Sequence, residues 1–517
     1  MQSPFVKRFR VTRWALVFLF GVLALVLKMA AAERPNILFI YTDDHSYRTV
    51  GCYPEAHPWV KTPNIDTLAA NGVRFTHAYI GTWCMPSRAT LLTGFHPWGV
   101  RSMRMEGPYP GSEYDPERIR FWPSVFRKNG YQTAHIGKWH TGTDTGYGRD
   151  WDYQIVWNRP RFPENSGHYY DDQLIEKNGA PAVMTKGYST DNYTDWAIRY
   201  IRGEEGRAGD KPWYLWLCYG AVHGPFTPAK RHKGNFAAES VETPADIFQP
   251  RNGKPEYVRK MDLWVPGPDG EPVLKKSPKK TLADAVHQYN EGVLAIDEGV
   301  GRLVAALKES GQYDNTLIVF TSDQGFAWGQ HGFNSKLAPY DATIRSPLIV
   351  SMPGRLPAGR VCAQPAGGID LPPTFFAFAG IDLPWDMHGR DLTPMLENPD
   401  SPPARSVLTA LTGASYGTDC DAVPDPAKEK DKLLRGNGIP WWVSWREGKH
   451  KYIRTLVADE IEELYDLEAD PEELDNLALK SGYRDTVLRY REATLGELRR
   501  TGAKMADALP PVAGLPE

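Results

Sequence analysis

The sequence predicts an α/β fold with a mostly parallel central sheet flanked by helices. Three apolar runs support this prediction, at residues 36–41, 213–219 and 317–320, and polar residues follow each of them. Continuous apolar runs of this length are typical of strands that are buried on both faces, as in a parallel sheet. Helical segments separate the runs, so strands and helices alternate along the chain.

Four segments outside residues 84–94 are predicted to be helices. Residues 63–70 and 122–129 each carry a proline near the start and are followed by a glycine that ends the helix. Residues 188–202 have the apolar spacing of an amphipathic helix. Residues 282–310 form a longer helix, which is again closed by a glycine.

Length and composition limit the classes of protein to consider. The 517 residues are enough for one large core and more than one domain. With 41% hydrophobic and 24% charged residues, the chain is globular rather than disordered. With a formal net charge of −3, the chain lacks the basic character of a nucleic-acid-binding protein, so we expect no nucleic-acid partner.

Residues 1–32 have the features of a secretory signal peptide. Lys7 and Arg8 belong to a basic start, an apolar run covers residues 14–27, and three alanines at 30–32 offer a cleavage site. The apolar run is shorter than the roughly 20 residues that span a bilayer, so we expect no stable membrane span. A retained signal anchor is the alternative. The predicted location is periplasmic or secreted.

Two adjacent carboxylates, Asp43 and Asp44, follow the first predicted strand. In open α/β sheets, ligand sites lie at the carboxyl ends of the strands. Neighbouring buried carboxylates are unfavourable unless a cation or hydrogen-bond donors compensate them. The pair therefore indicates a site for a hard metal ion, although a turn with a helix cap is an equal alternative.

The segment at residues 84–94, C-M-P-S-R-A-T-L-L-T-G, places a thiol just before a predicted helix. We expect Ser87 to cap this helix, whose N-terminus favours an anion. Arg88 adds five donors that suit a tetrahedral oxyanion such as sulfate or phosphate. Taken alone, Cys84 indicates either a nucleophile beside an anion pocket or an inert buried thiol.

A second segment with candidate catalytic residues lies at residues 130–140, G-Y-Q-T-A-H-I-G-K-W-H. Its middle is predicted to be a strand that ends with Lys138 and His140. Side chains alternate along a strand, so these two point to the same side.

The two segments resemble the signatures of the type I, formylglycine-dependent sulfatases, which belong to the alkaline-phosphatase-like superfamily. The first matches C-x-P-S-R-x-x-L-x-x-G at every fixed position, and the second matches G-Y-x-T-x-x-x-G-K-W-H. Further along, L-Y-D-L, D-P-x-E and N-L resemble the family's small C-terminal domain, which is built on an antiparallel sheet. The resemblance spans roughly residues 35–477 and implies an alkaline-phosphatase-like fold.

This resemblance implies a nucleophile and a metal site. Cys84 is expected to be converted by a formylglycine-generating maturation enzyme into an aldehyde whose hydrate is the nucleophile. The expected metal ligands are Asp43, Asp44, the modified Cys84, Asp323 and Gln324. These oxygen ligands suit Ca²⁺ best and Mg²⁺ second. Relatives carry Asn or His in place of Gln324, whose amide oxygen can still coordinate on a longer arm.

The resemblance also implies how sulfate is held and protons are moved. Arg88, Lys138 and Lys336 are expected to hold sulfate oxygens, with Lys336 also near the leaving group. His223 is expected to protonate the leaving oxygen, and His140 to accept a proton from the hydrate. Histidine suits both tasks because its ordinary pKa is about 6.5.

The domain organisation follows from these matches and from composition. We predict a catalytic domain at residues 33–400 and a C-terminal domain at 401–517. A segment at about 231–280, rich in Lys, Pro and Gly, is predicted to be an insertion. For this insertion we favour a solvated loop over a wall that recognises the substrate.

The predicted function is hydrolysis of a sulfate ester, with a sulfated polysaccharide or glycosaminoglycan fragment as the expected substrate. One alternative is a phosphodiester or phosphonate hydrolase of the same superfamily. Another is a protein that binds sulfated glycans without catalysis, if Cys84 remains a thiol. The other four cysteines could form two disulfides in an oxidising compartment, but their spacing selects no partners.

Overall fold

The computed structural model describes residues 34–100, 120–402 and 405–517, apart from 414–419, 426–427, 430–432 and 435. The predicted signal peptide at 1–32 lies outside the described residues. Within the described part of the chain, no helix is both long enough and apolar enough to cross a membrane.

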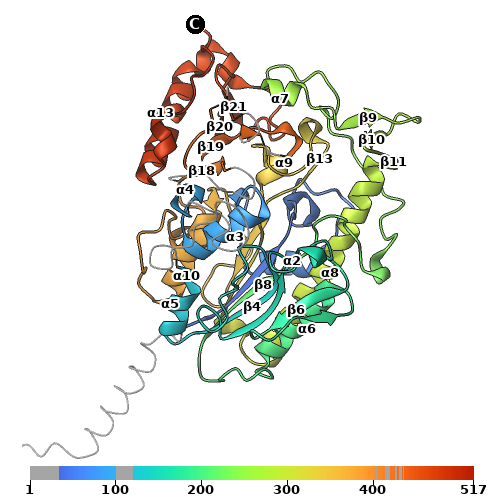
Figure 1. The fold of residues 1–517 in the computed structure, drawn as a ribbon, viewed down its shortest axis with the longest axis vertical. Coiled ribbons are helices and arrows are strands. Elements are labelled where there is room, and N and C mark those ends of the chain that lie inside the picture. Colours follow the sequence, from blue (N-terminus) through green and yellow to red (C-terminus); the bar gives the residue numbers. More distant parts are fainter. Residues whose placement is uncertain are drawn as a thin grey trace, which may run out of the picture.

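A ten-stranded mixed sheet forms the centre of the molecule (Figure 1). Its five middle strands are all parallel, in the order β12 (Thr316–Ser322), β1 (Asn36–Thr42), β8 (Trp213–Cys218), β4 (Gln132–Trp139) and β5 (Tyr153–Asn158). Strands β1, β8 and β12 come from the three apolar runs and are buried along their whole length. The α/β fold with a parallel central sheet is confirmed.

Antiparallel pairs extend this parallel core at both edges. On one side lie β15 (Leu348–Ser351), β2 (Val73–Phe75) and β16 (Arg360–Cys362), of which the last two are parallel to each other. On the other side lie β6 (Gln173–Lys177) and β7 (Val183–Thr185). The sheet is therefore parallel where the catalytic candidates lie and mixed at its edges.

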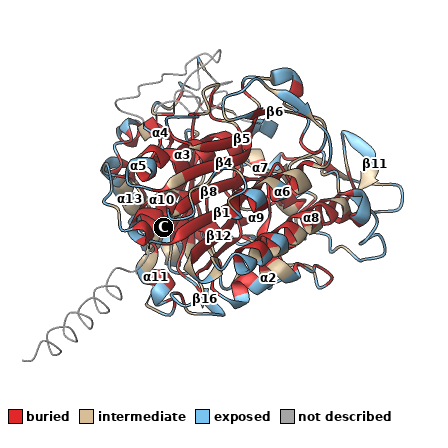
Figure 2. Cartoon of the chain, turned by 90° about the horizontal axis from the view of Figure 1, so that it is seen from below, coloured by how far each residue is buried: buried red, intermediate tan, exposed pale blue. Residues whose placement is uncertain are grey.

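Helices cover both faces of the sheet and enclose two cores, and Figure 2 shows the buried sheet between them. One face carries α2 (Pro63–Ala70), α6 (Ser189–Ile201) and α8 (Leu282–Glu309). The other carries α3 (Cys84–Thr93), α5 (Pro123–Lys128) and α10 (Leu371–Ala379). The four predicted helices correspond to α2, α5, α6 and α8, because apolar spacing and proline or glycine ends are local signals.

The helix that carries Cys84 begins earlier than the sequence suggested. Cys84 is its first residue, and Trp83, with an extended backbone, precedes it. Ser87 lies inside the helix and does not cap it, because its hydroxyl donates to the carbonyl oxygens of Trp83 (2.8 Å) and Asp323 (2.9 Å). Pro86 is tolerated in the first turn, where an N–H has no partner within the helix. The expected cap at Ser87 is wrong.

A separate four-stranded antiparallel sheet follows near the C-terminus. Its order is β18 (Ser406–Leu411), β19 (Trp442–Glu447), β20 (His450–Thr455) and β21 (Glu463–Asp466), and α13 (Arg484–Arg500) packs against it. The antiparallel C-terminal sheet that the resemblance implied is confirmed. We call it the C-terminal sheet. Figure 1 shows it beside α3 and α9 (Asp341–Ile344) of the larger part.

The predicted insertion at about 231–280 is partly structured. It contains α7 (Glu256–Arg259) and a small sheet of β9 (Trp264–Pro266), β10 (Pro272–Leu274) and β11 (Ser277–Thr281). Lys254 is buried, and its ammonium group donates to the hydroxyl of Tyr465 (2.7 Å) on the C-terminal sheet. The segment is therefore a solvated loop only in part, because one buried cation anchors it to a distant strand.

All five cysteines are free thiols, at positions 52, 84, 218, 362 and 420. The two disulfides that the cysteine count allowed are not formed. Four of the thiols are buried, and Cys52 is half-buried.

Candidate active site

Two neighbouring strands bring the candidate metal ligands together. In the pairing of β1 with β12, Thr42 lies opposite Ser322, so the residues that follow both strands share one edge of the sheet. The carboxylates of Asp43, Asp44 and Asp323 are buried, and they offer oxygens that all lie within 4.8 Å of one another. The backbone N–H of Asp44, a residue with a φ of 54°, donates to Asp323 Oδ1 at 2.9 Å.

Two buried cations balance these carboxylates. Arg88 Nη2 lies 3.0 Å from Asp43 Oδ2 and 3.6 Å from Asp323 Oδ2, and Arg88 Nη1 donates to the carbonyl of Lys138 at 3.2 Å. The ammonium group of Lys138 donates to the same oxygen of Asp43. Burial alone raises the pKa of Asp43, but Lys138 and Arg88 reverse this effect and hold the pKa well below its ordinary value. Burial, reinforced by the charge of Asp43, raises the pKa of Asp323 to about 7.

Cys84, Lys336 and His223 approach this group from three different segments. Lys336 Nζ lies 2.5 Å from Asp44 Oδ1 and 3.5 Å from Cys84 Sγ. His223 Nε2 lies 3.7 Å from Asp44 Oδ2. Ligand atoms of Cys84, Asp43 and His223 also lie within 4.8 Å of one another. The structure therefore gathers residues from positions 43 to 336 around one thiol.

The orientation of His223 is set by its backbone. Its Nδ1 lies 2.8 Å from the carbonyl oxygen of Gly224, which can only accept, so Nδ1 carries a proton and Nε2 faces the site. Removal from water lowers the pKa of His223 to about 4, an effect that Asp44 partly offsets. The imidazole is therefore neutral at pH 7 in the free protein.

His140 lies just after β4, beside Arg159 rather than against Cys84 in the contacts of the described residues. Each of its ring nitrogens is 3.2 Å from Arg159 Nη1. The guanidinium group of Arg159 lies over the ring of Tyr169, 4.9 Å from its centroid. Tyr169 in turn stacks on His223 with ring centroids 3.9 Å apart, and its hydroxyl is 3.4 Å from Lys138 Nζ.

Arg159, Tyr169 and Tyr289 therefore belong to the site or its support, and sequence reasoning missed all three. Tyr289 on α8 accepts a hydrogen bond from the N–H of Ser46 (2.8 Å) and donates to the carbonyl of Asp44, which holds the loop after β1. The sequence carries no signal for these residues. Tyr289 looks like any buried residue of a helix, and the other two lie in loops without a motif.

The donor set fits a hard divalent cation. Asp43 Oδ1, Asp323 Oδ2 and Gln324 Oε1 are buried and accept no hydrogen bond from any residue that the structure describes. Buried acceptors without a hydrogen-bond partner are rare, so three at one edge of a sheet indicate a site that suits a cation. Carboxylate and amide oxygens are the ligands that Ca²⁺ and Mg²⁺ prefer. The amide nitrogen of Gln324 donates to Asp44 Oδ1, which orients the Gln324 side chain within the group.

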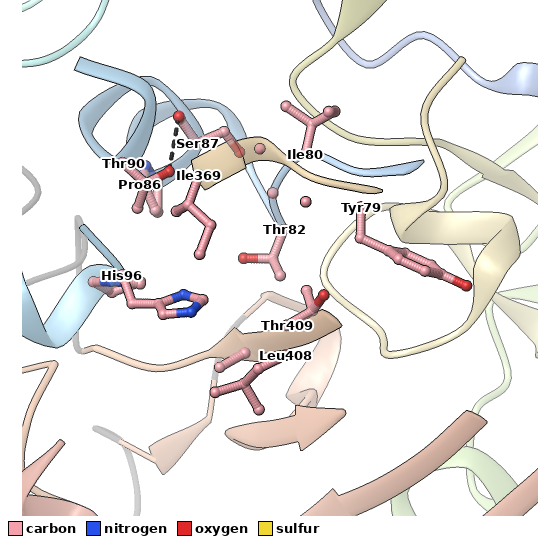
Figure 3. A pocket seen from close by; sticks show the side chains of 15 residues that line it. Tyr79, Ile80, Thr82, Pro86, Ser87, Thr90, His96, Ile369, Leu408 and Thr409 are labelled. Atoms are coloured by element: carbon pink, nitrogen blue, oxygen red, sulfur yellow. Dashed lines mark hydrogen bonds between the residues drawn. The ribbon is translucent and has the colours of Figure 1, made fainter. Parts of the chain in front are cut away.

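The rear of α3 faces a small cavity of about 40 Å³, shown in Figure 3. Pro86, Ser87 and Thr90 line it from the helix, and Leu408 and Thr409 line it from β18 of the C-terminal sheet. This volume holds little more than a water molecule, so the cavity is not a substrate site. The helix carrying Cys84 and β18 of the C-terminal sheet thus line opposite parts of one small cavity.

The chain matches known proteins over most of its length. The sulfatase family profile matches residues 35–381. The N-acetylglucosamine-6-O-sulfatase of Bacteroides thetaiotaomicron is 30% identical over 504 residues, which cover 87% of this chain and 84% of that protein.

Two solved structures superpose on most of this chain and share its fold. One, of a protein in complex with its substrate D-glucosamine-2-N,6-O-disulfate, superposes with a TM-score of 0.74 at 26% identity and covers 91% of this chain and 99% of its own. The phosphonate monoester hydrolase of Silicibacter pomeroyi superposes with a TM-score of 0.68 at 22% identity and covers 91% and 97%. The second match shows a shared fold alone.

Proposed function

Because the chain belongs to the sulfatase family of sulfuric ester hydrolases, we propose that it removes sulfate from a sulfated carbohydrate, with Cys84 converted to formylglycine as the nucleophile. The observation that carries this proposal is the position of Cys84 Sγ, 3.5 Å from Lys336 Nζ and beside the buried carboxylate group. The named relative and the substrate of the first solved neighbour support an amino sugar as the carbohydrate.

The conversion of Cys84 requires a separate maturation enzyme. The Cβ–S bond breaks, sulfur leaves as hydrogen sulfide, water supplies the aldehyde oxygen, and an external oxidant accepts two electrons and two protons. The hydrate of that aldehyde would supply the attacking oxygen as the ester S–O bond breaks, and would release sulfate as the aldehyde re-forms. The net reaction consumes one water molecule and yields an alcohol and sulfate.

The surrounding side chains have distinct proposed tasks. Arg88, Lys138 and Lys336 bind sulfate oxygens and stabilise the charge that develops on them. A divalent cation, Ca²⁺ first and Mg²⁺ second, held by the three carboxylates, Gln324 and the modified residue at position 84, would polarise a sulfate oxygen. The three cations would position the sulfate group for attack and compensate the negative charge of its oxygens.

The two histidines would move the protons. His223 Nε2 gives a proton to the leaving alcohol oxygen, and His140 accepts the proton of the second hydroxyl of the hydrate. The negative charge of a bound sulfate ester favours the charged imidazolium, so it raises the pKa of His223 from its low value in the free protein. Arg159 Nη1 lies 3.2 Å from each ring nitrogen of His140, of which only the unprotonated one can accept its proton, so Arg159 has to move away from that nitrogen when His140 acts as a base.

Export is part of the same proposal. Residues 1–32 have the pattern of a signal peptide, which would place the mature enzyme in the periplasm or outside the cell, where sulfated polysaccharides are met.

A phosphonate or phosphodiester hydrolase is the alternative function, because the same fold occurs in a phosphonate monoester hydrolase and three cations would also hold a phosphoryl group. Parallel assays on aryl sulfates, aryl phosphonates and phosphodiesters separate the two. A higher kcat/KM for phosphonates than for all sulfate esters would favour the alternative.

The proposal is tested first by the mass of the tryptic peptide that spans residues 75–88. In protein from a host with the maturation enzyme, we expect it to be about 18 Da lighter than the thiol form, because CHO replaces CH₂–SH. Only thiol in such a host would overturn the catalytic proposal and leave a glycan-binding protein.

The acid role of His223 predicts a dependence on the leaving group. In His223→Ala, we expect kcat for an unactivated sugar sulfate to fall by about 10²- to 10⁴-fold, the usual contribution of a general acid. An activated 4-nitrophenyl sulfate should lose far less, because its leaving oxygen needs no proton. An equal loss on both substrates would contradict the acid role.

A further inference from the structure

We propose that Trp442 of the C-terminal sheet is a positioning residue for catalysis, because its indole N–H holds the loop that carries Lys336. The proposal rests on the proposed role of Lys336 in binding sulfate. Trp442 Nε1 donates to the carbonyl oxygen of Leu337 at 2.7 Å, and Leu337 directly follows Lys336. Trp442 itself touches no reacting atom in the contacts of the described chain.

The loop needs such a hold because its backbone is strained. Ser335 has a φ of 120° and Leu337 a φ of 88°, and Lys336 lies between them. Residues other than glycine are rare in this region, and such conformations persist only where the surroundings enforce them. The position of the Lys336 side chain, 2.5 Å from Asp44 and 3.5 Å from Cys84, depends on both strained neighbours.

Trp442 is suited to enforce this backbone. It is fully buried, begins β19, and pairs with Leu411 and Thr455 on the strands to either side. Its ring belongs to the same apolar cluster as Leu337. A residue on an inner strand of a four-stranded sheet is held by strands on both sides and moves little, so a carbonyl that accepts from its buried side chain is fixed.

A second attachment holds the same loop further along the chain. The backbone N–H of Asp341 donates to Glu473 Oε2 at 2.6 Å, and the carboxylate of Asp341 accepts from Lys451 Nζ at 2.7 Å. Glu473 and Lys451 both belong to the C-terminal part. The C-terminal part of the chain therefore holds the loop that carries Lys336 through hydrogen bonds to its backbone and a buried ion pair.

The neighbouring Trp441 provides a matched control. It is as deeply buried as Trp442 but belongs to the apolar cluster on the other face of the sheet, and its Nε1 has no hydrogen-bond partner among the described residues. Trp441→Phe and Trp442→Phe thus remove the same atoms from equally buried sites. They differ in the loss of the bond to Leu337.

We expect Trp442→Phe to lower kcat/KM for 4-nitrophenyl sulfate by about tenfold, the effect of one buried hydrogen bond, and Trp441→Phe to change it by less than about twofold. Thermal unfolding of both variants reports any shared loss of packing. If the Phe variant does not fold, 3-benzothienylalanine at position 442 removes the N–H and keeps the ring size.

A double-mutant cycle identifies the residue through which Trp442 acts. In a Lys336→Met background, Trp442→Phe should produce no further loss of activity, because the side chain that it positions is gone. Equal losses in both Trp variants, or a full tenfold loss in the Lys336→Met background, would overturn the proposal.

Failure of the proposed function is separable from failure of this inference. If the wild-type enzyme turns over no sulfate ester, the function fails, but binding of inorganic sulfate by calorimetry still tests Trp442. There we expect weaker binding in Trp442→Phe than in Trp441→Phe. Equal binding would overturn the inference.

Discussion

Replacing Cys84 with alanine is expected to lower kcat/KM for sulfate esters by at least about 10⁴-fold, because covalent catalysis loses its nucleophile. The side chain is buried in the first turn of α3, where only the Sγ atom is removed and the helix begins in the same way. Activity is measured with 4-nitrophenyl sulfate and with a sulfated amino sugar. Circular dichroism and the midpoint of thermal unfolding report whether the fold is intact.

Cys52→Ser is the matched control for this prediction. Cys52 is a half-buried free thiol outside the site, so its loss should leave kcat/KM within about twofold of the wild type. If Cys84→Ala kept more than about a tenth of the wild-type kcat/KM, the nucleophile would have to be another group and the formylglycine mechanism would be wrong.

Removal of divalent cations is expected to lower kcat/KM by at least about 10³-fold, and Ca²⁺ should restore it more fully than Mg²⁺. Asp43, Asp44 and Asp323 repel one another, and three buried oxygens at this edge accept no hydrogen bond from the residues that the structure describes. A bound cation neutralises both effects. Because it binds the folded chain alone, Ca²⁺ at about 100 times its Kd should stabilise the fold by about 2.7 kcal/mol.

The stabilisation is measured as a Ca²⁺-dependent rise in the midpoint of thermal unfolding after treatment with EDTA. Asp323→Asn should abolish most of that rise, because it removes one of the three charges. Asp297→Asn is the control, since Asp297 is also a buried carboxylate but bonds Asn64 and Ile65 away from the site. Full activity after chelation, or an undiminished rise in Asp323→Asn, would contradict the metal site.

Much of the fold could be predicted because its signals are local. A strand that is buried on both faces is recognised by a nearly continuous run of apolar residues, as in β1 and β12. Proline near the start of a helix and glycine after its end mark the helix boundaries. The start of α3 was misplaced because Ser87 has the residue type of a cap. Its hydroxyl instead bonds the carbonyl of Asp323, more than 200 residues away, and no local rule contains that partner.

The predicted disulfides also show that local sequence does not determine contacts between distant segments. Composition and the predicted signal peptide allow two bridges, but the structure leaves all five cysteines as thiols. A disulfide forms only where two Cα atoms lie within about 7 Å in the right orientation. That distance depends on how the chain packs, and the number of cysteines does not predict it.

By itself, the sequence determined the residue types of the candidate site. Cys84 and Arg88 stand one helical turn apart, and Lys138 is the penultimate residue of β4, so short contiguous segments already bring a candidate nucleophile and candidate sulfate-binding cations into their local geometry. Tertiary structure alone decided the assembly. It set Asp43 beside Asp323, stacked Tyr169 on His223, and bonded Trp442 to the carbonyl of Leu337, next to Lys336. The physical reason is that residue type and local backbone are encoded within a few positions, whereas contacts between distant segments depend on how strands order in the sheet and how the second sheet packs against the first.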